Sequence, residues 1–305
     1  MDVDRKLGIY LNDGIRGDVE AGRHNFFTIL MKTFADRDFE VTLYPNTPEE
    51  RLRSADRPGY SMFHLETSTH ERSLDVRLAY MYPFWRIERA RWREDYRLAR
   101  MPFRPETIDE KAAQQFFNFW RRQTFVGKLA KDSEKGFVLV ALQGRLLEQR
   151  HGQTMAPIEM VRTTIAEERF RKIRIKLHPS EIHDRAELTA LTALARDSRV
   201  EIITDGNIHQ LLQDCDYVVT ENSSVAFKGI LHRRPAICFG ETDFHHLFAS
   251  VAREGAPKAF KNILVPTRAY AKYFYWFLQL NCINAGRDFA PDRILEQVRV
   301  FGWKV

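Results

Sequence analysis

The sequence has few cysteines and no long apolar segment. Its 305 residues contain Cys215, Cys238 and Cys282, an odd and scattered set with no paired Cys/His spacing. This pattern argues against a disulfide framework or a zinc site and favours a reducing compartment. No run approaches the roughly 20 apolar residues of a membrane span, and the start, MDVDRKLGIYLNDG, lacks the apolar stretch of a signal peptide. We therefore expect a cytoplasmic protein, at most peripheral to the inner face of the membrane.

Common cofactor and metal motifs are also missing. The sequence contains neither a GxxxxGK[ST] phosphate loop nor a GxGxxG fingerprint, which argues against a nucleotide kinase or an ordinary NAD enzyme. Asp214-Cys215-Asp216 has the Asp-x-Asp form of metal-dependent transferases, but it precedes an apolar segment, so we interpret it as a solvated turn. His245 and His246 lie near Asp243 without further ligand spacing. We expect no metal and no cofactor.

The composition is that of a folded protein with a basic charge balance. Hydrophobic residues make up 44%, aromatic residues 12% and charged residues 29% of the chain, too many aromatics for a disordered chain. The formal net charge is +6 and the pI about 9.2. This balance suits an anionic partner, which leaves a nucleotide, an acidic glycan, nucleic acid or an anionic membrane surface open.

Seven arginines alternate with aromatic residues between Trp85 and Arg104. One interpretation is a solvated amphipathic helix whose Trp85, Trp92 and Tyr96 pack inward. Alternatively, the segment 86–104 binds an anionic acceptor or lipid headgroups. The pattern also suits single-stranded nucleic acid, but no RNA-binding signature accompanies it, so we expect no nucleic-acid partner.

Apolar runs and helical periodicity alternate through the chain, which predicts an α/β fold with parallel sheets. The length fits two domains. Expected strands are 7–11, 39–44, 60–65, 76–82, 137–142, 173–177, 200–204, 217–220 and 236–239. Expected helices are 19–34, 109–125, 158–170, 185–195, 208–212, 225–231, 269–280 and 291–300. With 129–136 as the linker, we expect an N-terminal acceptor domain (1–130), a nucleotide-sugar-binding domain (136–260) and C-terminal helices packing across both (261–305).

Three polar motifs follow predicted strands, where open α/β sheets bind ligands. Asn12-Asp13-Gly14 supplies an acid suited to general-base work, or a simple turn. In the 176–179 segment, proline holds the preceding His178 extended; this histidine can donate to a phosphate, or is an ordinary surface residue. The 220–224 segment, TENSS, opens a helix whose hydroxyls and backbone N–H groups suit a phosphate, although helix capping also explains one of these residues.

These motifs, in this order, resemble those of bacterial GT-B sialyltransferases. The run DYVVTENSSVAFKGILHRRPAICFG, with FVLVALQ and IKLHP upstream, is similar to capsular polysaccharide synthesis proteins, including Kdo transferases; the likeness covers 137–240. It implies two Rossmann-like domains facing a cleft. It further implies the following site residues: catalytic Asp13 and His178, and nucleotide-sugar-binding Gly14, Gln143, Lys176, Pro179, Glu221, Asn222, Ser223 and Ser224. Asn12 departs from the pattern, since sialyltransferases usually carry a second acid there.

The expected function is metal-independent transfer of an acidic sugar, Kdo or sialic acid, from a CMP-activated donor. The acceptor is a surface polysaccharide or its lipid-linked precursor, hence an anionic glycan or glycolipid partner. Two alternatives stay open. One is a GT-B transferase with a UDP-, GDP- or CDP-linked donor, and the other is an inactive glycan-binding homologue.

Overall fold

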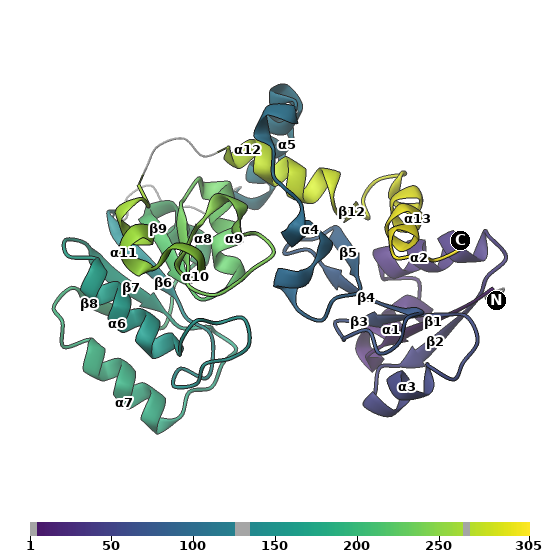
Figure 1. Cartoon of the computed structure of the whole chain (residues 1–305), viewed down its shortest axis with the longest axis horizontal. Helices are drawn as coiled ribbons and strands as arrows, with labels where there is room; N and C mark the ends of the chain where they lie inside the picture. The colour runs from purple at the N-terminus through teal and green to yellow at the C-terminus, as the bar shows by residue number, and fades with distance from the viewer. Residues whose placement is uncertain (1–4, 126–134, 265–268) are drawn as a thin grey trace. The chain divides into compact units, whose positions relative to one another are not determined.

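The computed structural model describes residues 5–125, 135–264 and 269–305, which form two compact units (Figure 1). The first unit comprises Met1–Leu98 and Phe277–Val305, and the second comprises Ala99–Trp276. The boundaries between the two units therefore fall after Leu98 and after Trp276. The sequence suggested domain boundaries near residues 130 and 260 instead. Most of the proposed linker lies outside the described residues.

The first unit is built on a six-stranded sheet of order β12-β5-β4-β3-β1-β2. Its strands are β1 (Lys6–Leu11), β2 (Glu40–Pro45), β3 (Tyr60–His64), β4 (Ser73–Leu78), β5 (Phe84–Glu88) and β12 (Ile283–Asn284). The pairs among β1, β2, β3 and β4 are parallel, but β4–β5 and β5–β12 are antiparallel. The sheet is therefore mixed rather than purely parallel.

Its helices are α1 (Asp13–Glu20), α2 (Asn25–Ala35), α3 (Pro48–Arg53) and α13 (Ala290–Val300). Apolar residues of α2 and α13, such as Phe26 and Ile294, enter one core with alternate residues of the strands, and the two helices lie side by side in Figure 1. The expected single helix 19–34 is instead two helices. Gly22, with φ +69°, separates them, because this left-handed conformation ends an α-helix and suits glycine.

The arginine-rich segment is not an amphipathic helix, which corrects that interpretation. It begins in β5 and continues through short turns, η1 (Arg93–Asp95), α4 (Arg97–Arg100) and η2 (Pro105–Thr107). Trp85 and Tyr96 are buried as expected, whereas Trp92 is only half-buried. Arg86 and Glu88 are buried too, at 3% exposure each. Alternation along β5 points Trp85 to the core and Arg86 to the opposite face of the sheet.

The second unit contains an all-parallel sheet of order β11-β10-β9-β6-β7-β8. Its strands are β6 (Phe137–Ala141), β7 (Lys172–Lys176), β8 (Val200–Ile203), β9 (Cys215–Thr220), β10 (Ala236–Cys238) and β11 (Ala249–Ser250). Five of these six were predicted. The predicted parts of β6, β9 and β10 are apolar and buried on both faces, whereas β7 alternates isoleucine with lysine and arginine. The short β11 was not predicted.

Helices connect these strands and complete the unit. They are α5 (Glu110–Phe125), α6 (Pro157–Glu167), α7 (Arg185–Leu194), α8 (Ile208–Asp214), α9 (Ser224–Gly229), η3 (Ile230–His232), η4 (His245–Leu247), α10 (Val251–Glu254), α11 (Ala256–Lys261) and α12 (Tyr270–Phe274). A π-helical segment, Tyr275–Leu280, follows α12. The α12 helix packs on α5 in the second unit, whereas α13 belongs to the first. No helix in the described ranges is long and apolar enough to cross a bilayer.

Candidate functional site

The carboxyl ends of β9, β6 and β7 lie next to one another at one edge of the second sheet. β6 pairs in parallel with both neighbours, so the residues that follow these strands share that edge. Gln143 follows β6, His178 follows β7, and Ser223 follows β9. The topology therefore places three predicted site residues at a common edge, from three distant parts of the sequence.

His178 is exposed in the loop after β7, and its ring is oriented by a local hydrogen bond. The backbone N–H of Ser180 donates to Nδ1 of His178 at 3.3 Å. In the neutral ring the proton then resides on Nε2, which is left to donate to a ligand. Pro179 lies in the exposed turn between these two residues, where it shapes the loop.

The side chain of Lys176, the last residue of β7, makes structural contacts that were not predicted from the sequence. Its side chain is buried, and Nζ donates to the backbone oxygens of Thr204 at 2.6 Å and Asp205 at 3.1 Å. The ammonium group thereby links β7 to the end of β8. These bonds give Lys176 a structural role, and its predicted contact with the ligand stays a prediction.

Ser223 and Ser224 differ in what their hydroxyl groups already do. Ser223 is the N-cap of α9, and its Oγ accepts a hydrogen bond from the N–H of Val225 at 3.3 Å. Its own N–H donates to Oγ1 of Thr220. Ser224 is half-buried, and its hydroxyl forms no hydrogen bond within the described ranges. Capping therefore accounts for Ser223, while the Ser224 hydroxyl remains able to bind a ligand.

Glu221 and Asn222 fasten the turn after β9 to the loop after β6. Glu221 is 2% exposed, and its Oε2 accepts a hydrogen bond from the N–H of Thr154 at 3.1 Å. Burial raises the pKa of Glu221 to about 7, against the opposing effect of the N–H groups of Thr154 and Met155. Asn222 donates through Nδ2 to the oxygen of Gly152 at 3.3 Å.

Apart from Gln143, the loop after β6 was not predicted to lie at this edge. Oε1 of Gln143 and Oγ1 of Thr154 are buried, and neither has a partner among the residues that the structure describes. Gly152 has φ +74°. A Cβ on Gly240 would lie 2.2 Å from the oxygen of Gly152. Two glycines at positions 152 and 240 were the available signal, but only the fold shows that they touch.

Asp13 and Gly14 form the first turn of α1 in the first unit, after the carboxyl end of β1. Asn12 is the N-cap, with Oδ1 accepting from the N–H of Ile15 at 2.9 Å. The Asp13 side chain is 86% exposed and pairs with Arg16 at 2.9 Å. Among the described residues, a Cβ on Gly14 would meet only the Asn12 side chain, at 3.9 Å. The motif is thus a helix start that presents an accessible carboxylate.

The residues discounted as metal ligands have other roles. Nδ1 of His246 lies 3.1 Å from the hydroxyl of Tyr273 and Nε2 lies 2.9 Å from the oxygen of Met101. Asp214 accepts from Gln210, and Asp216 pairs with Arg171. Across residues 5–125, 135–264 and 269–305, no group of three or more His, Cys, Asp or Glu side chains could hold a metal ion.

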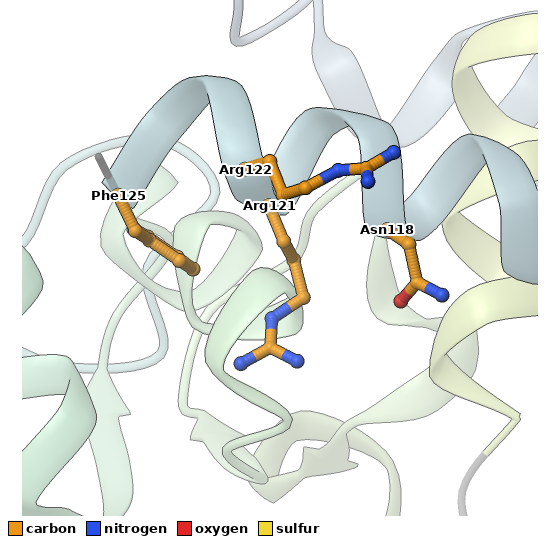
Figure 2. A pocket seen from close by; sticks show the side chains of 4 residues that line it. All are labelled: Asn118, Arg121, Arg122 and Phe125. Atoms are coloured by element: carbon orange, nitrogen blue, oxygen red, sulfur yellow. The ribbon is translucent and has the colours of Figure 1, made fainter.

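A separate cavity of about 540 Å³ lies on α5, lined by Asn118, Arg121, Arg122 and Phe125 (Figure 2). Burial, and to a lesser extent the charge of Arg233, lower the pKa of Arg121. None of the predicted site residues lines the described part of this cavity.

Comparisons with known proteins support this architecture. The profile of the family described as "Capsule polysaccharide biosynthesis protein" matches residues 94–281. Among solved structures, the β-Kdo 2,7-transferase of Thermosulfurimonas dismutans KpsC is 14% identical, with a TM-score of 0.55 over 95% of this chain and 99% of that one. The β-Kdo 2,4-transferase of the same protein is 12% identical, with a TM-score of 0.47 over 88% and 89%. A search of curated proteins found no match.

The first of these likenesses shows the fold, and the two units with parallel-dominated sheets confirm the expected α/β, GT-B-like class with two Rossmann-like domains. The family profile spans more than half of the sequence. The chain therefore belongs to the capsule polysaccharide biosynthesis protein family.

Proposed function

We propose that this protein is a glycosyltransferase that transfers an acidic sugar, such as Kdo or sialic acid, from a CMP-activated donor. The acceptor is a capsule polysaccharide or its lipid-linked precursor. One observation carries the proposal: His178, with Nε2 left as a hydrogen-bond donor, shares a sheet edge with the hydroxyl groups after β9. The family and the fold support it.

In the proposed reaction, the bond between the anomeric carbon and the phosphate oxygen of CMP breaks, and its electron pair stays on that oxygen. The Nε2–H of His178 donates to the phosphate, and the Ser224 hydroxyl donates beside it, so negative charge is stabilised as it develops. The acceptor hydroxyl oxygen forms the new bond to the sugar, and its proton passes to a base, for which Asp13 is the candidate. This scheme uses no metal ion.

We further propose a cytoplasmic location with peripheral membrane contact through segment 86–104. Arg89, Arg91 and Arg104 in that segment are exposed, and exposed basic side chains are attracted to anionic headgroups. Cosedimentation with vesicles rich in anionic lipid, compared with neutral vesicles, tests this part of the proposal.

A thermal-shift screen of CMP, UDP, GDP and CDP without added metal tests the donor. A ligand that binds the native state raises its melting temperature, and we expect CMP to do so selectively. Stabilisation by another nucleotide alone would favour the alternative donor, and CMP binding without turnover of any CMP-sugar would favour an inactive homologue. Loss of activity in EDTA that manganese restores would contradict the metal-free scheme.

A further inference from the structure

The loop after β6, residues 142–156, begins between the two motifs that the proposed function uses. β6 lies between β9 and β7 in the sheet. The first residues of this loop therefore lie, along the carboxyl edge, between the Ser223 turn and the His178 loop. Arg150 is a cationic residue of this loop.

The middle of the loop is fixed in place by non-local contacts. The oxygen of Gly152 accepts hydrogen bonds from the N–H of Glu241 at 2.8 Å and from Asn222 at 3.3 Å. The N–H of Arg150 donates to Oε1 of Gln153 at 2.9 Å, and the N–H of Gln153 donates back to the oxygen of Arg150 at 3.1 Å. Arg150 is thus held against the turns that follow β9 and β10.

The guanidinium group of Arg150 has no partner in the described parts of the chain. Its Nε is buried and forms no hydrogen bond. Neither of its terminal nitrogens is both buried and unpaired. Among the other half-buried arginines of this unit, Arg171, Arg174 and Arg199 pair with carboxylates. Arg234 donates to backbone oxygens, and Nε of Arg121, which lines the cavity on α5, is unpaired like that of Arg150. A half-buried cation that no acid neutralises is expected where a ligand supplies the negative charge.

Glu221 does not supply the negative charge that would neutralise Arg150. It is the acid whose pKa Arg150 affects, but burial outweighs this effect and keeps the pKa near 7. Its Oε2 is bonded to Thr154, and its buried Oε1 has no partner in the ranges that the structure describes. A direct ion pair between the two residues is therefore not formed.

We infer that Arg150 binds the negatively charged group of the donor at this edge. The group is either the phosphate of the nucleotide or the carboxylate of the acidic sugar, since a guanidinium fork matches both in a bidentate fashion. The inference deepens the proposed function and rests on it for the identity of the donor. It assigns a ligand-binding role to a residue outside the His178 and Ser223 motifs.

The test compares wild type, Arg150→Gln and Arg150→Lys by titration calorimetry with CMP, cytidine and free N-acetylneuraminate. If Arg150 binds the phosphate, Arg150→Gln should bind CMP about 10- to 100-fold more weakly, with cytidine affinity unchanged. If Arg150 binds the carboxylate, Arg150→Gln should keep its affinity for CMP. Its affinity for free N-acetylneuraminate should then fall by a similar factor. Arg150→Lys keeps the positive charge but not the guanidinium fork, so its affinity should fall less than that of Arg150→Gln.

Arg162→Gln is the matched control, because Arg162 lies on α6, outside the loop, is exposed and already pairs with Glu159. It should leave every affinity unchanged. Equal affinities of wild type and Arg150→Gln for all three probes, or no binding of these probes or of UDP by wild type, would overturn the inference. If Arg150→Gln fails to fold, the comparison of Arg150→Lys with wild type decides. Binding of UDP in place of CMP would contradict the proposed donor, yet Arg150→Gln should then weaken UDP instead.

Discussion

The backbone N–H of Ser180 donates to Nδ1 of His178 at 3.3 Å. This bond orients an exposed imidazole and leaves Nε2 as its hydrogen-bond donor. The local turn thus gives the ring the orientation that the proposed phosphate contact requires, and the residue that makes the bond is only two positions away in the sequence.

Replacing His178 should therefore affect turnover far more than folding. We expect His178→Ala to lower the rate by about 10²–10³, the usual effect of removing a donor that stabilises developing negative charge, and to change stability by under about 0.5 kcal/mol. Steady-state assays with a CMP-sugar and denaturant unfolding measure the two quantities. His178→Asn is the control for the turn, since its side-chain oxygen can still accept from Ser180; it should fold normally and remain slow. A normal rate in either variant would remove His178 from the mechanism.

Asp13→Asn tests the proposed base. The change keeps the helix start, because Asn12 supplies the cap, so stability should move within about 0.5 kcal/mol. Turnover should fall by about 10²–10⁴ if the carboxylate takes the acceptor proton, while CMP affinity stays constant. Asp18→Asn, on the same helix and paired with Arg23, is the matched control and should keep full activity. If Asp13→Asn were as active as Asp18→Asn, the base would be another residue.

Ser224→Ala and Ser223→Ala should behave differently. Ser223 caps α9, so its loss should cost about 0.5–2 kcal/mol of stability. The Ser224 hydroxyl makes no such bond within the described residues, so Ser224→Ala should leave stability intact and weaken CMP binding by about 1.5–3 kcal/mol, as expected for a lost bond to a charged group. Unfolding curves and CMP titrations separate the two effects. Unchanged CMP affinity in Ser224→Ala would show that its hydroxyl does not contact the phosphate.

The second sheet could be predicted more fully than the first, for a physical reason. β6 and β9 are buried on both faces, and their sequences are therefore continuous apolar runs. β5 instead alternates core residues with the buried ions Arg86 and Glu88, opposite Arg77 and Asp75 of β4. Buried charges obscure the apolar signal, so this strand was interpreted as a helix.

The shared edge of the candidate site was predictable where it depends on local sequence. His178 and Ser223 each follow a strand that is visible in the sequence, so their common edge could be inferred. The structural role of Lys176 depends on backbone oxygens about thirty residues away, after β8. The loop after β6 depends likewise on contacts of Gly152 with residues after β9 and β10. Such contacts exist only once the sheet order is known.

Gly240→Ala should disrupt that loop. A Cβ at residue 240 would lie 2.2 Å from the oxygen of Gly152 and 3.1 Å from Oε2 of Glu221, and overpacking of this kind costs about 1–3 kcal/mol. We expect lower stability together with weaker CMP binding, because the loop would move away from the edge. Gly17→Ala is the control, since a Cβ at residue 17 would meet nothing within 4 Å among the described residues; inside a helix it should stabilise by about 0.5–1 kcal/mol. Unaltered stability and CMP affinity in Gly240→Ala would contradict the close contact.

Glu221 should make stability depend on pH. The carboxyl titrates near 4.5 when unfolded and near 7 in the folded protein, chiefly because it is buried. Below pH 4.5 it is protonated in both states and destabilises neither. As the pH rises from 4.5 to 7, the unfolded chain releases the proton first, so the native state progressively loses stability.

Glu221→Gln removes this titration while its amide oxygen can still accept from Thr154. The stability of the variant relative to wild type should therefore increase between pH 5 and pH 8 by roughly 2 kcal/mol, given 1.36 kcal/mol for each unit of pKa shift. Urea unfolding at both pH values measures the difference. Glu201→Gln is the control for the substitution itself, because Glu201 is 54% exposed beside Arg174, and a change at so exposed a position should alter stability by under about 0.5 kcal/mol. A difference between Glu221→Gln and wild type that stays constant from pH 5 to pH 8 would mean that Glu221 is ionised throughout, and that burial does not govern its charge.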